Sequence, residues 1–471
     1  MTVTSFSAHL FQDRRSIHEF LASCRTIAID KEHAQVVSLS LEIPQLDALA
    51  VLSLLQQPDR PYFYWEKQSQ GTAIAATEPL LHLQVDGAQR FTQAQHFICT
   101  SLVDTVSAGA LHLPFAGPHF FCSFTFFDQT HREARLFPGA SVFLPRWQIA
   151  CDQDQAVLVA NAIVDAETPL EKLAREIWQR WQLLQTPRRC PSPRSQPTNF
   201  AYPLLANSDA FTTAVADTLE HIEAEKLQKL VLAHTLDVKT PQPLDLCHAL
   251  GTLRARYPEC YVFAVSNGQG QNFIGASPER LIELRDRHLV TDALAGSAPR
   301  GHSRADDEAL GHQLLNSKKD GHEHRVVLDF IRDSLWELGI TPQVASLPHL
   351  LQLPNIQHLR TLITAEVPQH LHLLEILAAL HPTPAVAGMP REIAQAQIHR
   401  HEPFERHLYA APLGWIDHQG NGEFTVGIRS ALINGFQARL YAGAGIVAGS
   451  DPQRELAEIQ LKLHTLLDAL M

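Results

Sequence analysis

The 471-residue chain lacks the sequence features of secreted, membrane-spanning and nucleic-acid-binding proteins. Its seven cysteines form no C-x-x-C pair, and such a scattered, odd-numbered set is typical of buried thiols in a reducing compartment. No basic region precedes an apolar stretch as in a signal peptide, and no apolar run approaches the ~18–20 residues of a membrane span. The formal net charge of −12 argues against non-specific binding to nucleic acid or anionic membranes. We therefore expect a cytoplasmic protein without a nucleic-acid or membrane partner.

Internal repeats are also absent, and the only low-complexity tract is a proline-rich segment near the middle of the chain. Four prolines lie between residues 186 and 197, where they exclude a helix or a central strand. We predict a linker at residues 186–204, between an N-terminal α+β half (1–185) and a C-terminal half (205–471). Because each half is strand-rich and its strands need other elements to pack against, we expect the linker to join two halves of one sheet system.

The end of the chain carries a glycine-punctuated apolar run, Ala442-Gly-Ala-Gly-Ile446, that leads into a predicted helix. Pro452 fits the first turn of this helix, where its missing N–H costs nothing. Glu455, Glu458 and Lys462 follow at spacings of three and four residues, so they share one helix face. The pattern indicates a site for an anionic ligand and a hard cation, beside backbone that only glycine permits.

The stretch 317–331 repeats this arrangement, with Asp320 and Glu323 three residues apart. Mg²⁺ takes octahedral oxygen ligands and is normally held by one or two carboxylates together with water and ligand oxygens. Two acidic pairs match that chemistry, and we expect the two helices to meet around one Mg²⁺. The alternative is a pair of solvated helix faces. His322 and His324 suggest zinc, but nothing else in the sequence completes a set with zinc spacing.

Two residues are candidates for proton transfer. Lys229 precedes a predicted apolar strand, 230–238, and burial in a cleft would lower its pKa and make it a usable general base. A solvated lysine at a strand start is the more common alternative. Glu279 follows a proline turn in Gly275-Ala-Ser-Pro-Glu279, where a raised pKa would let it protonate a leaving hydroxyl. A surface glutamate paired with Arg280 is an equally common outcome.

Three further residues suit contacts with an anionic ligand. Arg429 lies within a sequence predicted to be one apolar strand, 424–432, where an unpaired guanidinium is costly and so indicates a bound anion. His358 precedes the predicted strand 360–367 and can reach a cleft, although a core or capping histidine fits equally well. Tyr409 fits either the core or a ligand contact.

Taken together, these stretches resemble the chorismate-utilising enzymes, which include isochorismate synthase, salicylate synthase and the large subunits of anthranilate and aminodeoxychorismate synthase. The resemblance covers about residues 205–471 and implies an α+β fold, the chorismate-binding fold, with two β-rich halves packed with helices around a central cleft. The matching stretches follow the family's order: Lys229-Leu-Val-Leu232, Gly275-Ala-Ser-Pro-Glu279, Leu294-Ala-Gly-Ser-Ala-Pro-Arg-Gly301, Lys319-Asp-Gly-His-Glu-His324, Gln357-His358, His381-Pro-Thr-Pro-Ala-Val-Ala-Gly-Met-Pro390, Gly427-Ile-Arg429 and residues 442–462.

The resemblance implies chorismate, a dianion, as the ligand and Mg²⁺ as the cofactor that neutralises its ring carboxylate. Glu323 and Glu458 are the implied direct ligands of the metal. Asp320 and Glu455 are implied to hold metal-bound waters. These roles give a chemical meaning to the two acidic pairs, which their spacing alone left open.

The resemblance also implies a set of contacts with chorismate. Arg429 and Tyr409 are implied to bind the enolpyruvyl carboxylate, and Lys462 and the Gly296-Ser297 turn to border the ring carboxylate. His358 is implied to line the ring pocket. The full implied set is Gly296, Ser297, His358, Ala385, Tyr409, Arg429, Gly443, Gly445 and Lys462.

Four positions distinguish among the family's activities. Members that add water at C2 are similar to this chain in having a lysine base at the position of Lys229 and an acid at that of Glu279. Ala295 stands where aminodeoxychorismate synthases carry a nucleophilic lysine, and Ala385 where salicylate synthases tend to have threonine. The resemblance therefore predicts a Mg²⁺-dependent isochorismate synthase, which interconverts chorismate and isochorismate.

The remaining expectations concern pathway and partners. The long N-terminal half favours menaquinone or phylloquinone biosynthesis by analogy. The alternatives are a salicylate synthase, a siderophore-pathway isochorismate synthase and, against the intact catalytic set, a silent chorismate-binding relative. With water as the nucleophile we expect no glutamine amidotransferase subunit, and we expect a monomer.

Overall fold

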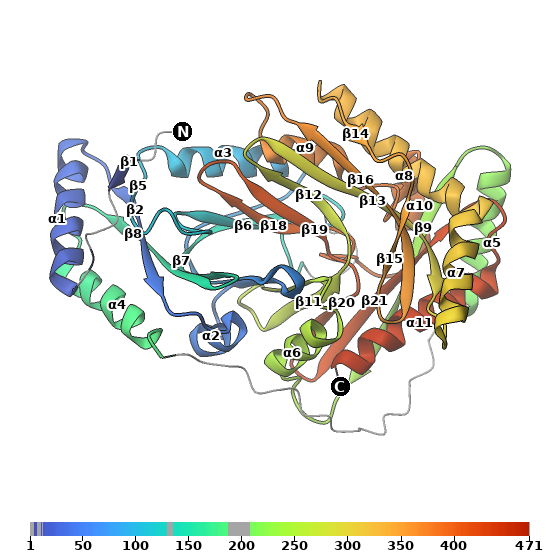
Figure 1. Cartoon of the computed structure of the whole chain (residues 1–471), viewed down its shortest axis with the longest axis horizontal. Helices are drawn as coiled ribbons and strands as arrows, with labels where there is room; N and C mark the ends of the chain where they lie inside the picture. Colours follow the sequence, from blue (N-terminus) through green and yellow to red (C-terminus); the bar gives the residue numbers. More distant parts are fainter. Residues whose placement is uncertain (1–3, 7–10, 12, 130–134, 187–207, 471) are drawn as a thin grey trace.

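The computed structural model describes residues 4–6, 11, 13–129, 135–186 and 208–470 (Figure 1). Most of the predicted linker, residues 187–204, lies outside the described residues. Across the described residues, the helices all fall short of the length and apolar character needed to cross a bilayer. The helices are α1 (Arg14–Asp30), α2 (Ala48–Leu55), α3 (Arg90–Leu102), α4 (Leu170–Leu183), α5 (Ser208–Glu223), α6 (Leu246–Arg256), α7 (Arg304–Asn316), α8 (Lys318–Glu337), α9 (Leu373–Leu380), α10 (Arg391–His401) and α11 (Pro452–Leu470).

The described strands form one hydrogen-bonded network, which divides at β7 into two arms, called the first and the second sheet below. The first sheet runs in the order β1 (Thr4–Phe6), β5 (Val106–Gly109), β2 (Gln35–Ile43), β8 (Gln155–Val164), β7 (Ala140–Asp152), β4 (Thr72–Val85), β3 (Tyr62–Lys67), β10 (Tyr261–Ser266), β11 (Gln271–Ser277), β20 (Ser430–Asn434), β21 (Gln437–Ile446), β9 (Lys229–Lys239) and β17 (Gly388–Met389). The second sheet leaves β7 through β6 (His119–Phe124), β18 (Pro412–Asp417), β19 (Gly422–Val426), β12 (Arg280–Arg285), β13 (His288–Pro299) and β16 (Ile356–Glu366), whose outer edge carries β15 (His349–Gln352) and β14 (Gln343–Val344).

The two halves of the chain share both sheets. Strand β3 of the N-terminal half pairs with β10 of the C-terminal half, and β6 pairs with β18. Every residue of β6 and β10 is buried, which explains why both read as continuous apolar runs rather than as alternating patterns. The expectation of one sheet system built from both halves is thus confirmed for the described strands.

The chain passes between the two sheets at two neighbouring points. Residues 277–280 lead from β11 in the first sheet to β12 in the second, and Glu279 lies in that crossover. Residues 427–429 lead from β19 in the second sheet back to β20 in the first, and Arg429 ends that crossover. The first crossover is bonded to the end of β19, because Val426 N–H donates to the Glu279 carbonyl at 3.1 Å. Glu279 and Arg429, two predicted site residues, therefore lie at neighbouring passages of the chain between the two sheets.

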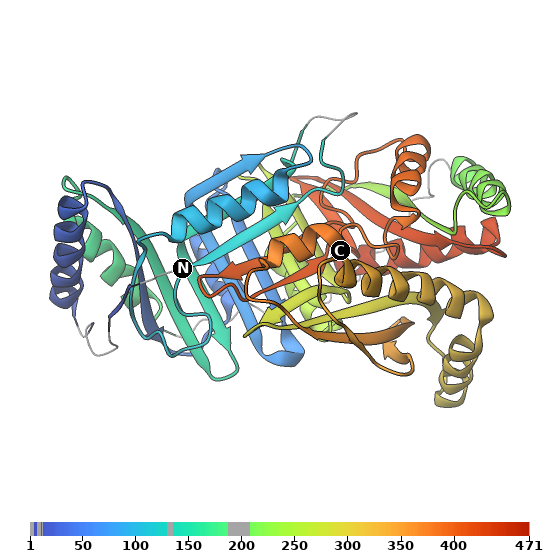
Figure 2. The same cartoon turned by 90° about the horizontal axis from the view of Figure 1, so that it is seen from above.

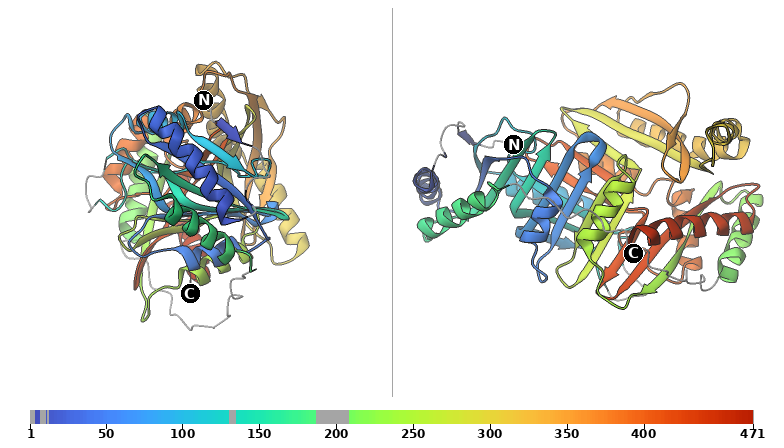
Figure 3. Two further views of the ribbon diagram at one scale, coloured as in Figure 1. Left: turned by 90° about the vertical axis from the view of Figure 1, so that its left-hand side faces the viewer. Right: turned by 60° about the horizontal axis from the view of Figure 1, so that its bottom comes forward.

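The helices cover the sheets from several sides. Helices α3 and α9 lie side by side on one face (Figure 2). At the end of the molecule that contains the crossovers, α8 packs on β13 of the second sheet and α11 packs on β21 of the first (Figure 3). The two acidic helices predicted from the sequence are therefore supported by different sheets, with their acidic turns facing a common space.

Three local expectations are wrong. Arg429 does not lie inside a strand: the predicted strand 424–432 breaks into β19 and β20, and Arg429 adopts a positive φ of 50° between them. Gly296 and Ser297 do not form a turn but belong to β13, where the register shifts between Ala295 and Ser297 and Gly296 has a φ of 78°. His358 lies within β16 rather than before it.

Candidate active site

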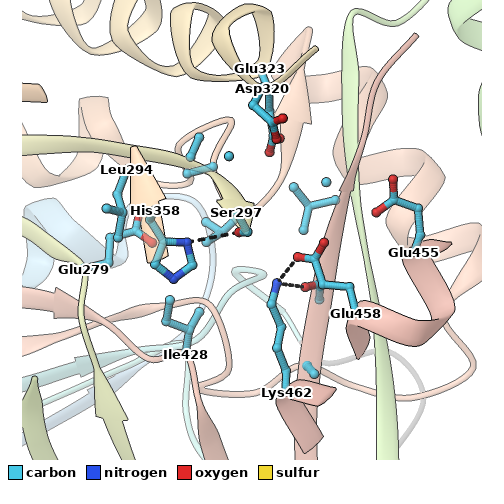
Figure 4. A pocket seen from close by; sticks show the side chains of 18 of the residues that line it. Glu279, Leu294, Ser297, Asp320, Glu323, His358, Ile428, Glu455, Glu458 and Lys462 are labelled. Atoms are coloured by element: carbon cyan, nitrogen blue, oxygen red, sulfur yellow. Dashed lines mark hydrogen bonds and ion pairs between the residues drawn. The ribbon is translucent and has the colours of Figure 1, made fainter. Parts of the chain in front are cut away.

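A cavity of about 400 Å³ lies between the two sheets, beside the crossovers and the acidic turns of α8 and α11 (Figure 4). Apolar side chains, among them Val231, Leu294 and Ile428, complete its wall. The cavity brings together nearly all of the predicted site residues: Glu279, Gly296, Ser297, Asp320, Glu323, His358, Ala385, Tyr409, Arg429, Gly443, Gly445, Glu455, Glu458 and Lys462.

Lys229, which is not part of the cavity wall, lies directly behind Glu323. It begins β9, its side chain is only 1% exposed, and its Nζ lies 2.9 Å from Oε1 of Glu323. This contact is an ion pair that lacks the alignment of a hydrogen bond. Gly445 makes room for it, because a Cβ there would lie 2.5 Å from Glu323 Oε1 and 3.1 Å from Lys229 Cε. Lys229 is therefore buried, which excludes the more common alternative of a solvated lysine at a strand start, and its role as a base stays a prediction.

Glu279 is buried in the crossover, with 5% of its surface exposed. Burial raises its pKa from 4.5 to about 8; the Lys229 charge opposes this rise and the Asp292 charge adds to it. Its backbone is fixed from both sides, since its N–H donates to Ser277 Oγ at 3.2 Å and its carbonyl accepts from Thr425 Oγ1 at 2.6 Å. At neutral pH Glu279 is therefore a carboxylic acid that can give up a proton.

Arg429, His358 and Ser297 form a chain of hydrogen bonds along the cavity wall. Arg429 Nη2 lies 2.7 Å from His358 Nε2, and His358 Nδ1 lies 3.0 Å from Ser297 Oγ. A guanidinium can only donate, so His358 Nε2 accepts and Nδ1 carries the proton. Burial and the Arg429 charge lower the pKa of His358 well below its usual value, in agreement with a neutral ring. Nδ1–H then donates to Ser297, whose own hydroxyl proton is free to donate to a ligand.

The second amino group of Arg429 has no hydrogen-bond partner among the described residues. This nitrogen, Nη1, is shielded from solvent. An unpaired buried guanidinium nitrogen is costly, so a carboxylate in the cavity would satisfy it. Lys462 provides a second cation, with Nζ 2.6 Å from Glu458 Oε1 and 2.8 Å from the Gly443 carbonyl.

Tyr409 lies between the cavity and the core. Its ring stacks on Tyr441 at 5.1 Å between centroids, and its hydroxyl would be 2.6 Å from a Cβ at Gly443. Burial raises the pKa of the phenol, which therefore stays a hydrogen-bond donor at neutral pH. Glycine at 443 is required for this approach of the hydroxyl to the β21 backbone.

The four carboxylates of α8 and α11 all have partners. Glu323 faces Lys229, Glu458 faces Lys462, and Glu455 faces Lys319 at 2.8 Å, while Asp320 bonds the Ser317 hydroxyl. Burial raises the pKa of Glu455, and the Lys319 contact opposes this rise. Among the described residues, no three His, Cys, Asp or Glu side chains are grouped so that they could together hold a metal ion.

The donor set nevertheless fits Mg²⁺ in two respects. The carboxylates of α8 and α11 offer only oxygen, the ligand type that Mg²⁺ prefers, and Figure 4 shows those of Asp320 and Glu323 directed into the cavity. Glycine at 445 also leaves the space that the Glu323 carboxylate occupies. The zinc alternative fits less well, because His322 is exposed and His324 is buried against Thr361 at 2.7 Å.

The family described as chorismate binding enzyme matches residues 19–471 of the chain, which includes the whole cavity. The chain belongs to the chorismate binding enzymes.

Relatives of this chorismate binding enzyme extend over most of its length. The salicylate biosynthesis isochorismate synthase of Pseudomonas aeruginosa is 34% identical over 92% of the chain and 90% of the relative. The isochorismate synthase MenF of Bacillus subtilis is 30% identical over 94% of the chain and 95% of the relative. Among solved structures, the menaquinone-specific isochorismate synthase MenF of Escherichia coli superposes with a TM-score of 0.76 at 27% identity, covering 96% of this chain and 100% of that one. The expected α+β chorismate-binding fold is confirmed.

Two residues that shape the cavity of this chorismate binding enzyme were not predicted from the sequence. Thr425 holds the Glu279 carbonyl although it lies 146 residues further along the chain. The fully buried Arg406 donates to the carbonyl oxygens of Val386 at 2.8 Å and Val231 at 2.9 Å, and so joins two segments of the wall. For Arg406, the sequence offers one indication of a role at the cavity, its position three residues before Tyr409.

Proposed function

We propose that this chorismate binding enzyme is an isochorismate synthase, which adds water at C2 of chorismate and releases the C4 hydroxyl. The proposal is carried by a buried carboxylic acid in the cavity wall, Glu279, together with a buried amine, Lys229, directly behind the wall at Glu323. The named activity of the P. aeruginosa and B. subtilis relatives supports the same reaction.

Binding of the substrate follows from the charges of the wall. Chorismate carries two carboxylates, and Arg429 and Tyr409, which both line the cavity, suit the enolpyruvyl carboxylate. Lys462 and the free hydroxyl proton of Ser297 suit the ring carboxylate. The apolar residues between these groups leave room for the six-membered ring.

The reaction then needs two proton transfers. Lys229 acts as the general base and takes a proton from the water that forms a bond to C2. Glu279 gives its proton to the C4 oxygen as the bond between C4 and that oxygen breaks, so a second water leaves. One water enters and one departs, without oxidation or reduction, and the reverse reaction uses the same two groups in exchanged roles.

We propose Mg²⁺ as the cofactor, held directly by Glu323 and Glu458 and through water by Asp320 and Glu455. When bound, the ion supplies positive charge that neutralises the ring carboxylate. The oxygen-only donor set and the space left by Gly445 support this proposal.

Incubation with chorismate and Mg²⁺, followed by chromatography of the products, tests the proposed activity. We expect isochorismate and chorismate at equilibrium, with no pyruvate. Release of pyruvate with salicylate would identify a salicylate synthase, and unchanged chorismate would contradict the isochorismate synthase proposal. Glu279→Gln protein, prepared in parallel, controls for contaminating activity.

The pathway is proposed to be menaquinone biosynthesis. MenF of B. subtilis and the menaquinone-specific enzyme of E. coli both match nearly the whole chain, including its N-terminal half. The second candidate is salicylate biosynthesis, which the name of the P. aeruginosa relative favours. We further propose that the enzyme is cytoplasmic and monomeric. Because water is its nucleophile, it needs no amidotransferase subunit.

A further inference from the structure

Lys319 makes an ion pair that the proposed reaction does not use. It lies in the first turn of α8, and its Nζ is 2.8 Å from Oε1 of Glu455 in the first turn of α11. The Glu455 side chain is only 4% exposed, whereas that of Lys319 is 38% exposed. The pair therefore joins a buried carboxylate to an ammonium that can reach water.

The two other lysine–glutamate pairs of the cavity differ in this respect. Lys229, which pairs with Glu323, is 1% exposed, and Lys462, which pairs with Glu458, is 20% exposed and also donates to a backbone carbonyl. Both lysines have a proposed function on the substrate. Lys319 has none, and its head group can leave its partner at the smallest cost in solvation.

We propose that Lys319 competes with the divalent cation for Glu455. In the paired arrangement the ammonium balances the buried carboxylate, which would otherwise be an uncompensated charge. When the cation site fills, the lysine turns toward solvent and Glu455 becomes available to the cation or its bound water. The inference rests on the proposed Mg²⁺ site and assigns Lys319 a role in setting how tightly that site binds.

The direction of the effect follows from the charges. A single positive charge beside Glu455 must be displaced before a divalent ion can use the carboxylate, so its removal strengthens cation binding. Because Lys319 is partly exposed, water screens the interaction, and we expect a gain of about tenfold rather than the far larger value of a dry pair. A purely structural lysine would give the opposite result, since losing a tie between α8 and α11 would weaken the site.

Substrate-free binding of Mn²⁺ measures this directly. Mn²⁺ takes the same oxygen ligands as Mg²⁺, and the electron paramagnetic resonance signal of the free ion gives the bound fraction without any turnover. We expect Lys319→Met to bind Mn²⁺ about tenfold more tightly than the wild type at one ionic strength. Lys318→Met is the matched control, because Lys318 is the exposed neighbour on the same helix turn.

The second comparison places both residues in one cycle. Glu455→Gln should weaken Mn²⁺ binding, and adding Lys319→Met to it should give much less than the tenfold gain, because the contested carboxylate is gone. Equal or weaker Mn²⁺ binding by folded Lys319→Met, with its unfolding temperature recorded, would overturn the competition. If Glu455→Gln left Mn²⁺ binding unchanged, Glu455 would have no part in the cation site and the competition would fail as well. A wild type that bound no Mn²⁺ would instead contradict the proposed metal site itself, which is a different failure.

Discussion

The two sides of the cavity hold their functional groups in different ways. On the strand side, Glu279, His358 and Arg429 are fixed by the backbone and by buried neighbours, some of which lie far away in the sequence. On the helix side, Glu455 and Glu458 each face a lysine in an ion pair, and we propose that a divalent cation can take the place of such a lysine. The same cavity thus combines a preformed surface with an exchangeable one.

This difference assigns different tasks to the two sides. Proton transfer needs a fixed geometry and a tuned pKa, and burial provides both at Glu279. Cation binding needs carboxylates that are charged and can change partner, and helix side chains with lysine partners provide that. Substitutions on the strand side should therefore reduce the rate of chemistry, and substitutions on the helix side should reduce cation affinity.

The largest effect is expected from the proton-transfer pair. Lys229→Met and Glu279→Gln should each lower kcat by about 10³-fold, because each removes a proton-transfer group from the reacting bond. Binding of chorismate should change little, since Arg429 and Lys462 remain. Single-turnover rates and equilibrium binding of chorismate separate the two quantities. Lys226→Met and Glu259→Gln, at exposed positions, are the controls. Near-normal turnover by Lys229→Met would remove Lys229 as the base.

A smaller effect, of a different kind, is expected on the helix side. Glu458→Gln should raise the Mg²⁺ concentration needed for half-maximal activity by about 10–100-fold, with much of kcat regained at high Mg²⁺. Chelation should likewise stop turnover, and added Mg²⁺ should restore it. Glu392→Gln, at an exposed position of α10, is the control. If extra Mg²⁺ rescued Glu279→Gln as well as Glu458→Gln, the division between the two sides would fail.

The helix side could be predicted from the sequence far better than the strand side. The spacing of Glu455, Glu458 and Lys462 predicts that they share one helix face, because helical periodicity depends only on residues that are close in the sequence. The strand side depends on where the chain changes sheet. The sequence around Arg429 is apolar and reads as one strand, yet a Cβ at Gly427 would lie 2.4 Å from the Leu408 carbonyl, a packing constraint from another segment. Such contacts between distant segments leave no periodic signal.

The pH dependence should also follow the strand side. With its pKa raised to about 8, Glu279 is protonated at neutral pH, so kcat/KM should fall by about tenfold per pH unit above 8. Asp292→Asn removes a charge that raises this pKa, and the fall should therefore begin at lower pH. A rate profile unchanged by Asp292→Asn would contradict the assignment of the basic limb to Glu279.

The same pKa makes a prediction for stability. Between 4.5 and about 8 the folded state keeps a proton on Glu279 that the unfolded state has lost, so the wild type loses stability as pH rises through this range. Glu279→Gln lacks that proton equilibrium. Its unfolding temperature relative to the wild type should therefore increase steadily from pH 5 to pH 8. A constant difference over this range would mean that Glu279 is not protonated in the fold.

The smallest expected effect tests whether the strand side is fixed by long-range contacts. Thr425→Val removes the hydroxyl that donates to the Glu279 carbonyl at 2.6 Å and keeps the side-chain shape. Thr291→Val is a matched control, because the Thr291 hydroxyl donates to the Leu281 carbonyl at 2.7 Å and both threonines are fully buried. Both variants should lose about 1–2 kcal/mol of stability. Only Thr425→Val should lower kcat, by about three- to tenfold, through misplacement of the acid.

The ratio of kcat in Thr425→Val and Thr291→Val distinguishes misplacement of Glu279 from a general loss of stability. Each variant is assayed the same number of degrees below its own unfolding temperature. Thr425 acts on Glu279 and not on the anion contacts, so KM should change little while kcat falls. Equal kcat in the two variants would mean that Val426 N–H, which also donates to the Glu279 carbonyl at 3.1 Å, suffices to place the acid. The fixed geometry of the strand side would then come from the crossover backbone alone, without help from neighbouring side chains.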